Sequence, residues 1–237
     1  MLEVLRRHKI DLLLVLILVL IDTGTKVAAY AFLPPGNWPI GIGDDLSLFL
    51  MLNDAGPALS RDAYAKYPSM PIEQAVAMLA MSAIIIALAR SGMRWCSRVL
   101  ASIGCFLAIS LAAFYLEPLI PKGFVEPRQA LILMMTSCLV LFLVLILCST
   151  TRYFRACFTL MAAAGAGNLL SFFYPPFAVV DFIHSRWVSG VLEVGSSNVA
   201  DVYALSCYLM LLAAPVYFLV RYLIKRPGRR RSSASPP

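Results

Sequence analysis

The chain has 237 residues, of which 60% are hydrophobic and 14% are charged. Soluble domains carry roughly 25% charged residues, so this chain has too little polar surface to face water on all sides. Its net charge of +7 could suggest nucleic acid. The basic residues, however, lie between apolar segments and at both chain ends, as the positive-inside rule describes. We therefore expect a membrane protein and no nucleic-acid partner.

Six segments approach the roughly 20 apolar residues that a helix needs to cross a bilayer. In chain order they are residues 10–33, 73–89, 99–116, 129–151, 155–173 and 201–222. They predict an all-α fold, a polytopic bundle of about six transmembrane helices, in a single membrane domain of residues 1–225. The first segment resembles a signal peptide at its basic start, but its apolar stretch is too long, so we expect it to be retained.

The charges between the segments predict the orientation of the bundle. With a cytoplasmic N-terminus, the connections that hold Arg94 and Arg152 lie inside, together with a basic, disordered tail of residues 226–237. The outer segments are then residues 34–72, 117–128 and 174–200. The first of these is too long for a simple connection, so we expect a small structured element at the membrane surface. Both termini are predicted to be cytoplasmic.

Two aspartates are predicted at the outer ends of helices. Asp181 follows the fifth segment and Asp201 opens the sixth. Two carboxylates that meet cannot both ionise easily, so one stays protonated while the other acts as a base, as in an aspartic peptidase. A structural alternative stays open: Asp201 follows Asn198 and could cap the last helix, and Asp181 could be a solvated loop acid.

Metal and cofactor chemistry have little support in the sequence. The six cysteines form no C-x-x-C pair, and the chain has only two histidines, His8 and His184. Asp22 and Lys26 are spaced to share one face of the first helix, where they form either a structural ion pair or part of a functional site. We expect no metal and no organic cofactor.

Five short motifs carry a family resemblance. They are D-T-G-T-K at residues 22–26, N-D-A-G-P-A at 53–58, G-A-G-N-L-L at 165–170, V-V-D-F-I at 179–183 and N-V-A-D at 198–201. Their order and placement resemble signal peptidase II, the bacterial lipoprotein signal peptidase. The resemblance implies that Asp181 and Asp201 are a catalytic dyad. By the same match, the supporting or substrate-binding residues are Asp22, Lys26, Asn53, Asn168 and Asn198.

The resemblance also implies an activity and a location. The family comprises intramembrane aspartic endopeptidases that remove signal peptides from diacylglyceryl-modified prolipoproteins, just before the lipidated cysteine. This places the chain in the bacterial cytoplasmic (inner) membrane with its site near the outer face. The partners would be the prolipoprotein substrate and membrane lipids, and we expect a monomer.

The chain departs from the family pattern at several places, among them the glycine-asparagine motif and the number of helices. The family usually continues its glycine-asparagine motif into an Asp-Arg pair, where this chain has Ser171 and Phe172. Arg186, in the next loop, could replace the missing guanidinium. The family has four spanning helices, so residues 73–116 would be an inserted helical hairpin. A divergent member or paralogue fits best. Two alternatives stay open, a paralogue that binds lipidated peptides without cutting them and a carboxylate-based membrane transporter.

Overall fold

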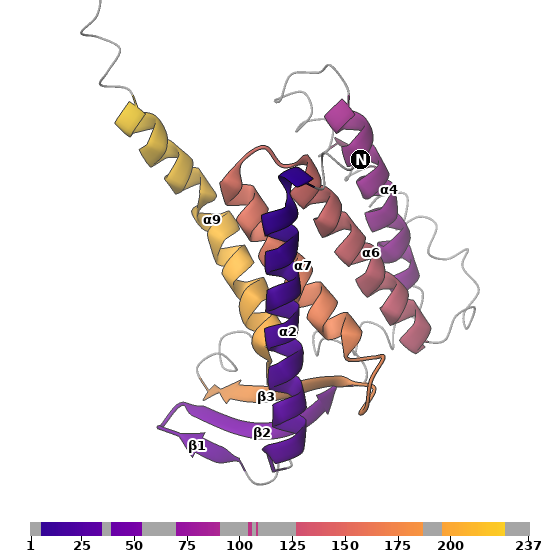
Figure 1. Cartoon of the computed structure of the whole chain (residues 1–237), viewed down its shortest axis with the longest axis vertical. Helices are drawn as coiled ribbons and strands as arrows, with labels where there is room; N and C mark the ends of the chain where they lie inside the picture. The colour runs from indigo at the N-terminus through magenta and orange to yellow at the C-terminus, as the bar shows by residue number, and fades with distance from the viewer. Residues whose placement is uncertain are drawn as a thin grey trace, which may run out of the picture.

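The computed structural model describes residues 6–34, 39–53, 70–90, 104–105, 108, 127–186 and 196–225. Within these ranges the chain forms five helices and a three-stranded sheet (Figure 1). The helices are α2 (Lys9–Phe32), α4 (Met70–Arg90), α6 (Pro127–Cys148), α7 (Arg152–Leu170) and α9 (Val199–Lys225). The strands are β1 (Ile40–Ile42), β2 (Leu46–Asn53) and β3 (Val179–Ser185).

Three of the helices are long and apolar enough to cross a membrane. They are α2 over Lys9–Phe32, α6 over Arg128–Cys148 and α9 over Val199–Ile224. The chain is therefore mostly helical with candidate membrane spans, as the hydropathy pattern predicts. α4 and α7 coincide with the second and fifth predicted segments. The third predicted segment, residues 99–116, and the basic tail lie largely or wholly outside the described residues.

The sheet corrects the prediction of an all-α fold. β1 and β2 form an antiparallel hairpin, and its turn begins at Gly43 with a φ of 73°, a conformation that glycine adopts without strain. β3 then pairs antiparallel with β2, which places Met51 opposite Asp181. Strand pairing satisfies the backbone N–H and C=O groups of these short segments. Hydropathy does not reveal this pairing, because the two strands are far apart in the sequence.

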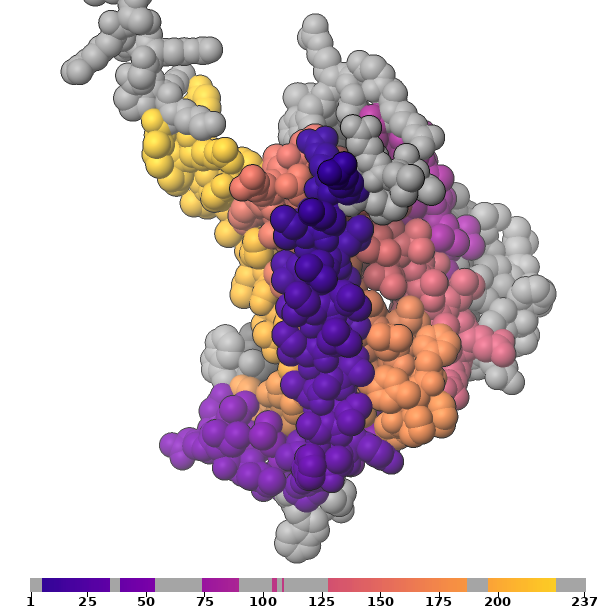
Figure 2. Space-filling view, in the orientation of Figure 1, coloured from indigo at the N-terminus to yellow at the C-terminus, as the bar shows by residue number. Residues whose placement is uncertain are grey.

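α7 is the central helix and contacts α2, α6 and α9. Small residues on α7 allow close packing: Ala162 and Ala163 are fully buried against Val15 and Val19 of α2 and Ile146 of α6. In the part of the chain that the structure describes, α4 packs against α6 and is not among the helices that contact α7 closely. Figure 2 shows α2 running along one face of the molecule as far as the sheet.

The sheet lies at one end of the helix bundle (Figure 1). Ala29, near the end of α2, packs against Val180 and Phe182 of β3 and so attaches the sheet to the bundle. The connection before α9 also joins the sheet, because Ser197 and Ile183 exchange backbone hydrogen bonds. This end of the molecule therefore gathers helix termini and strands that are distant in the sequence.

Candidate active site

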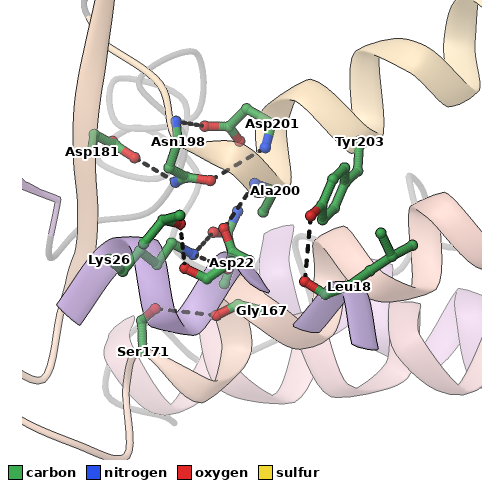
Figure 3. A network of polar contacts seen from close by, with 12 residues as sticks. Leu18, Asp22, Lys26, Gly167, Ser171, Asp181, Asn198, Ala200, Asp201 and Tyr203 are labelled. Atoms are coloured by element: carbon green, nitrogen blue, oxygen red, sulfur yellow. Dashed lines mark hydrogen bonds and ion pairs between the residues drawn. The ribbon is translucent and has the colours of Figure 1, made fainter. Parts of the chain in front are cut away.

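Asp181 and Asp201 both hydrogen-bond to Asn198 (Figure 3). The side-chain Nδ2 of Asn198 donates to Asp181 Oδ1 at 2.6 Å. The backbone N–H of the same residue donates to Asp201 Oδ2 at 2.9 Å. Asp181 lies on β3, and this corrects its predicted position at the end of the fifth helix, which ends at Leu170. The two carboxylates are still brought together, through a single asparagine.

Asn198 and Asp201 also form a capping box at the start of α9. Asn198 Oδ1 accepts the backbone N–H of Asp201 at 3.2 Å, while the Asp201 carboxylate accepts the backbone N–H of Asn198. A carboxylate without a proton can only accept, so the Asn198 amide nitrogen must face Asp181 and its oxygen must face the helix. The cap considered for Asp201 therefore exists, and it fixes the orientation of both side chains.

β2 supplies the second donor to Asp181. Asn53 Nδ2 lies 3.4 Å from Asp181 Oδ2, so both oxygens of this carboxylate face amide donors. Asp181 is only 6% exposed. Burial, together with the nearby Asp201 carboxylate, raises the pKa of Asp181 to about 6, although the amides of Asn198 and Asn53 and the charge of Lys26 act in the opposite direction. Asp181 therefore titrates close to neutral pH.

α2 contributes a fully buried ion pair. Lys26 Nζ lies 2.7 Å from Asp22 Oδ2, and both side chains are 0% exposed. The other oxygen of Asp22 accepts the backbone N–H of Ala200 at 2.8 Å, at the positive end of α9. Lys26 Nζ also donates to Asn168 Oδ1 at 2.6 Å, and the Asn168 side chain hydrogen-bonds to Asp201. Because lysine only donates, the Asn168 amide nitrogen is the group that faces Asp201.

The structure thus joins all seven residues named from the sequence in one polar network. They are Asp22, Lys26, Asn53, Asn168, Asp181, Asn198 and Asp201. They come from α2, β2, α7, β3 and the start of α9. Within the described ranges, no group of three His, Cys, Asp or Glu side chains could hold a metal ion.

Gly167 is a further residue on which this network depends. A Cβ atom added at Gly167 would overlap the carboxylate of Asp22, whereas one added at Gly165 would meet open space. The glycine therefore allows α2 to place Asp22 directly against α7. The G-A-G-N motif contained this signal, but the sequence alone does not show which of its two glycines faces Asp22.

Ser171 and Phe172, which stand where the family motif has its Asp-Arg pair, are part of the packed structure. Ser171 is fully buried, and its Oγ donates to the carbonyl oxygen of Gly167 at 3.1 Å. Phe172 is 3% exposed and packs against Leu131 of α6 and Val179 of β3. The Phe172 ring therefore fills a place in the core between α6 and β3, the strand that carries Asp181.

Arg186 and Arg128 contact different parts of the chain. Arg186 follows the end of β3, where its backbone N–H donates to the carbonyl of Asp45 at 3.0 Å. Arg128, at the start of α6, donates from Nη2 to the carbonyl oxygen of Phe172 at 3.0 Å. The guanidinium beside Phe172 thus comes from a helix that the sequence motifs do not include.

Comparison with known protein families gives a match over the C-terminal part of the chain. The family model described as Signal peptidase (SPase) II matches residues 117–217. That range includes Asn168, Asp181, Asn198 and Asp201. No curated protein matches the chain. The matched range is less than half of the chain, and it supports assignment to a signal peptidase II-like family, which is a family of peptidases.

Proposed function

We propose that the chain is an intramembrane aspartic endopeptidase that removes signal peptides from lipid-modified prolipoproteins, with Asp181 and Asp201 as its catalytic pair. One observation carries the proposal: both carboxylates hydrogen-bond to Asn198 at the end of the bundle where the sheet meets the helices. The family match over residues 117–217 supports the same reading.

The surroundings of Asp181 and Asp201 suggest that the two acids have different roles in catalysis. A pKa of about 6 leaves Asp181 ionised yet basic near neutral pH, although both acids accept hydrogen bonds that favour their ionised forms. Asp181 is thus the base that takes a proton from water. The water oxygen attacks the scissile carbonyl carbon, and Asp201 holds the proton that passes to the leaving nitrogen as the C–N bond breaks.

The neighbouring polar residues keep this pair in place. Asp22 neutralises Lys26, so that the ammonium group can fix the Asn168 amide without leaving an unpaired buried charge. Asn168 and Asn53 then present amide groups beside Asp201 and Asp181. Amide side chains offer donors and an acceptor to an extended peptide backbone, which suits a substrate-positioning role.

The membrane arrangement is part of the proposal. We infer about six spans with both termini cytoplasmic, the sheet and the dyad near the outer face of a bacterial inner membrane, and residues 73–116 as an inserted hairpin. Apolar side chains of the sheet stay exposed, among them Ile40 of β1 at 48% and Leu52 of β2, opposite Val180, at 46%. Such a surface suits a substrate whose diacylglyceryl chains remain in the bilayer. The chain is proposed to act as a monomer.

The decisive experiment measures cleavage of a diacylglyceryl-modified precursor peptide by the purified full-length chain. Asp181→Asn and Asp201→Asn should each lower the rate by about 10²- to 10⁴-fold, the usual contribution of general acid–base groups. Asp44→Asn is the matched control, because Asp44 is exposed in the β1–β2 turn. The same peptide without lipid tests the substrate class.

Three results would contradict the proposal. Equal cleavage by the parent and both dyad variants would exclude the dyad. Equal cleavage of lipidated and unlipidated peptides would exclude the substrate class. Binding without cleavage by the parent would replace the peptidase with a peptide-binding paralogue.

A further inference from the structure

Arg128 holds both ends of the turn that leads from α7 to β3. Its Nη2 donates to the carbonyl oxygen of Phe172 at 3.0 Å and to that of Phe177 at 3.4 Å. Its guanidinium carbon also lies 6.0 Å from the centre of the Phe177 ring. A single side chain from α6 therefore spans the turn of residues 172–177.

This turn has a backbone conformation that needs support. Phe177 adopts a φ of 61°, which residues other than glycine rarely occupy. The Arg128 guanidinium contacts both the carbonyl and the ring of this residue. At the other end of the turn, the buried Phe172 ring packs between Leu131 of α6 and Val179, the first residue of β3. The turn, α6 and β3 thus form one packed unit.

The turn also joins two parts of the polar network. α7 ends at Leu170, shortly after Asn168, and Asp181 is the third residue of β3. The conformation of the turn therefore determines where Asp181 lies relative to Asn168 and the start of α9. We propose that Arg128 is a positioning residue for Asp181, acting through the turn and not through contact with the substrate. This inference rests on the proposed peptidase function.

The planar guanidinium suits this task better than an ammonium group. Nη2 of Arg128 donates to both carbonyls while the planar guanidinium also approaches the Phe177 ring, whereas lysine keeps the charge but not the planar group. Arg128→Lys should therefore retain part of the effect and Arg128→Gln little of it. Gln129→Ala is the matched control, because Gln129 is the exposed neighbour on the same helix.

The experiment combines steady-state cleavage of the lipidated precursor peptide with hydrogen exchange of the β3 amides. Arg128→Gln should lower kcat by about tenfold or more while KM changes by less than about twofold, because a displaced catalytic group slows chemistry more than binding. The amides of residues 179–185 should exchange faster than in the parent. Arg128→Lys should lie between the parent and Arg128→Gln, and Gln129→Ala should match the parent.

The outcomes separate this inference from the proposed function. If the parent cleaves and Arg128→Gln has the parent's kcat, the positioning role is wrong while the peptidase stands. A rise in KM at constant kcat would also overturn it, in favour of substrate contact. If the parent does not cleave the peptide, the proposed function fails. Unchanged exchange of the β3 amides in Arg128→Gln would then also refute the proposal that Arg128 supports the turn. Should Arg128→Gln fail to fold, parent-like kcat and exchange in Arg128→Lys would overturn the inference.

Discussion

The two ends of the α2–α7 contact handle charge in different ways. At one end, Asp11 of α2 pairs with Arg155 of α7 at 3.1 Å, and their side chains are 24% and 16% exposed. At the other end, Lys26 of α2 bonds Asn168 of α7 at 2.6 Å and pairs with Asp22, with both charged side chains fully buried. The side chains of the first pair are partly exposed to water, whereas those of the second are not.

This contrast indicates what each contact contributes. A partly exposed ion pair adds little to stability, because water solvates the separated charges nearly as well. A buried pair must be balanced inside the protein, so removal of one partner leaves a charge without solvent. We therefore expect large effects of substitution at the site end and small effects at the opposite end.

The largest effect on stability is expected from Lys26→Met. This change leaves Asp22 buried without its cation and should lower the free energy of unfolding by about 3–5 kcal/mol. Arg155→Met, at the opposite end, is the matched comparison and should cost about 1 kcal/mol or less. Denaturant unfolding in detergent measures both. Equal losses in the two variants would refute the contrast between the ends.

The pH dependence of stability should also originate at the site end. Burial raises the pKa of Asp181 from 3.8 to about 6, so the folded protein binds this proton more tightly than the unfolded chain. The resulting stabilisation is fully present below about pH 4 and is lost as the pH rises through 6, by roughly 3 kcal/mol at most. Asp181→Asn should flatten this part of the profile in thermal unfolding measured from pH 4 to 8. An unchanged slope would argue against a raised pKa.

The two glycines of the G-A-G-N motif offer a sharper comparison within one helix. Gly167→Ala should destabilise the fold by about 1–3 kcal/mol and reduce cleavage, because the new methyl group overlaps the Asp22 carboxylate. Gly165→Ala meets open space and should stabilise the helix by about 0.5–1 kcal/mol. Thermal unfolding of both variants checks the opposite signs, and a shared sign would mean that α2 and α7 pack differently.

The smallest effect is expected from Asp11→Asn. The variant loses the ion pair with Arg155 but keeps a polar group at a partly exposed position, so stability should change by about 1 kcal/mol or less. High salt should reduce even this difference, since it screens charges that water reaches. Unfolding measured at low and high salt checks this, and a loss as large as that of Lys26→Met would contradict it.

The sequence predicted which polar residues lie together better than it predicted the elements that carry them. Local motifs identified Asp181, Asn198 and Asp201, because short runs such as N-V-A-D are visible without knowledge of the fold. They did not show that Asp181 lies on a strand, because β3 acquires its structure by pairing with β2. The contacts of Arg128 were missed for a similar reason, since its partners lie 44 and 49 residues further along the chain.

By itself, the sequence determined that this chain has long apolar helices, and it showed which polar residues lie within and between them. Hydropathy and motif spacing are local properties, and a bilayer makes a helix the favoured state of a long apolar segment. Only the tertiary structure decided that Asn198 hydrogen-bonds to both Asp181 and Asp201, and that Gly167 is the glycine beside Asp22. Those contacts depend on which faces of distant segments pack together, and no local pattern specifies that.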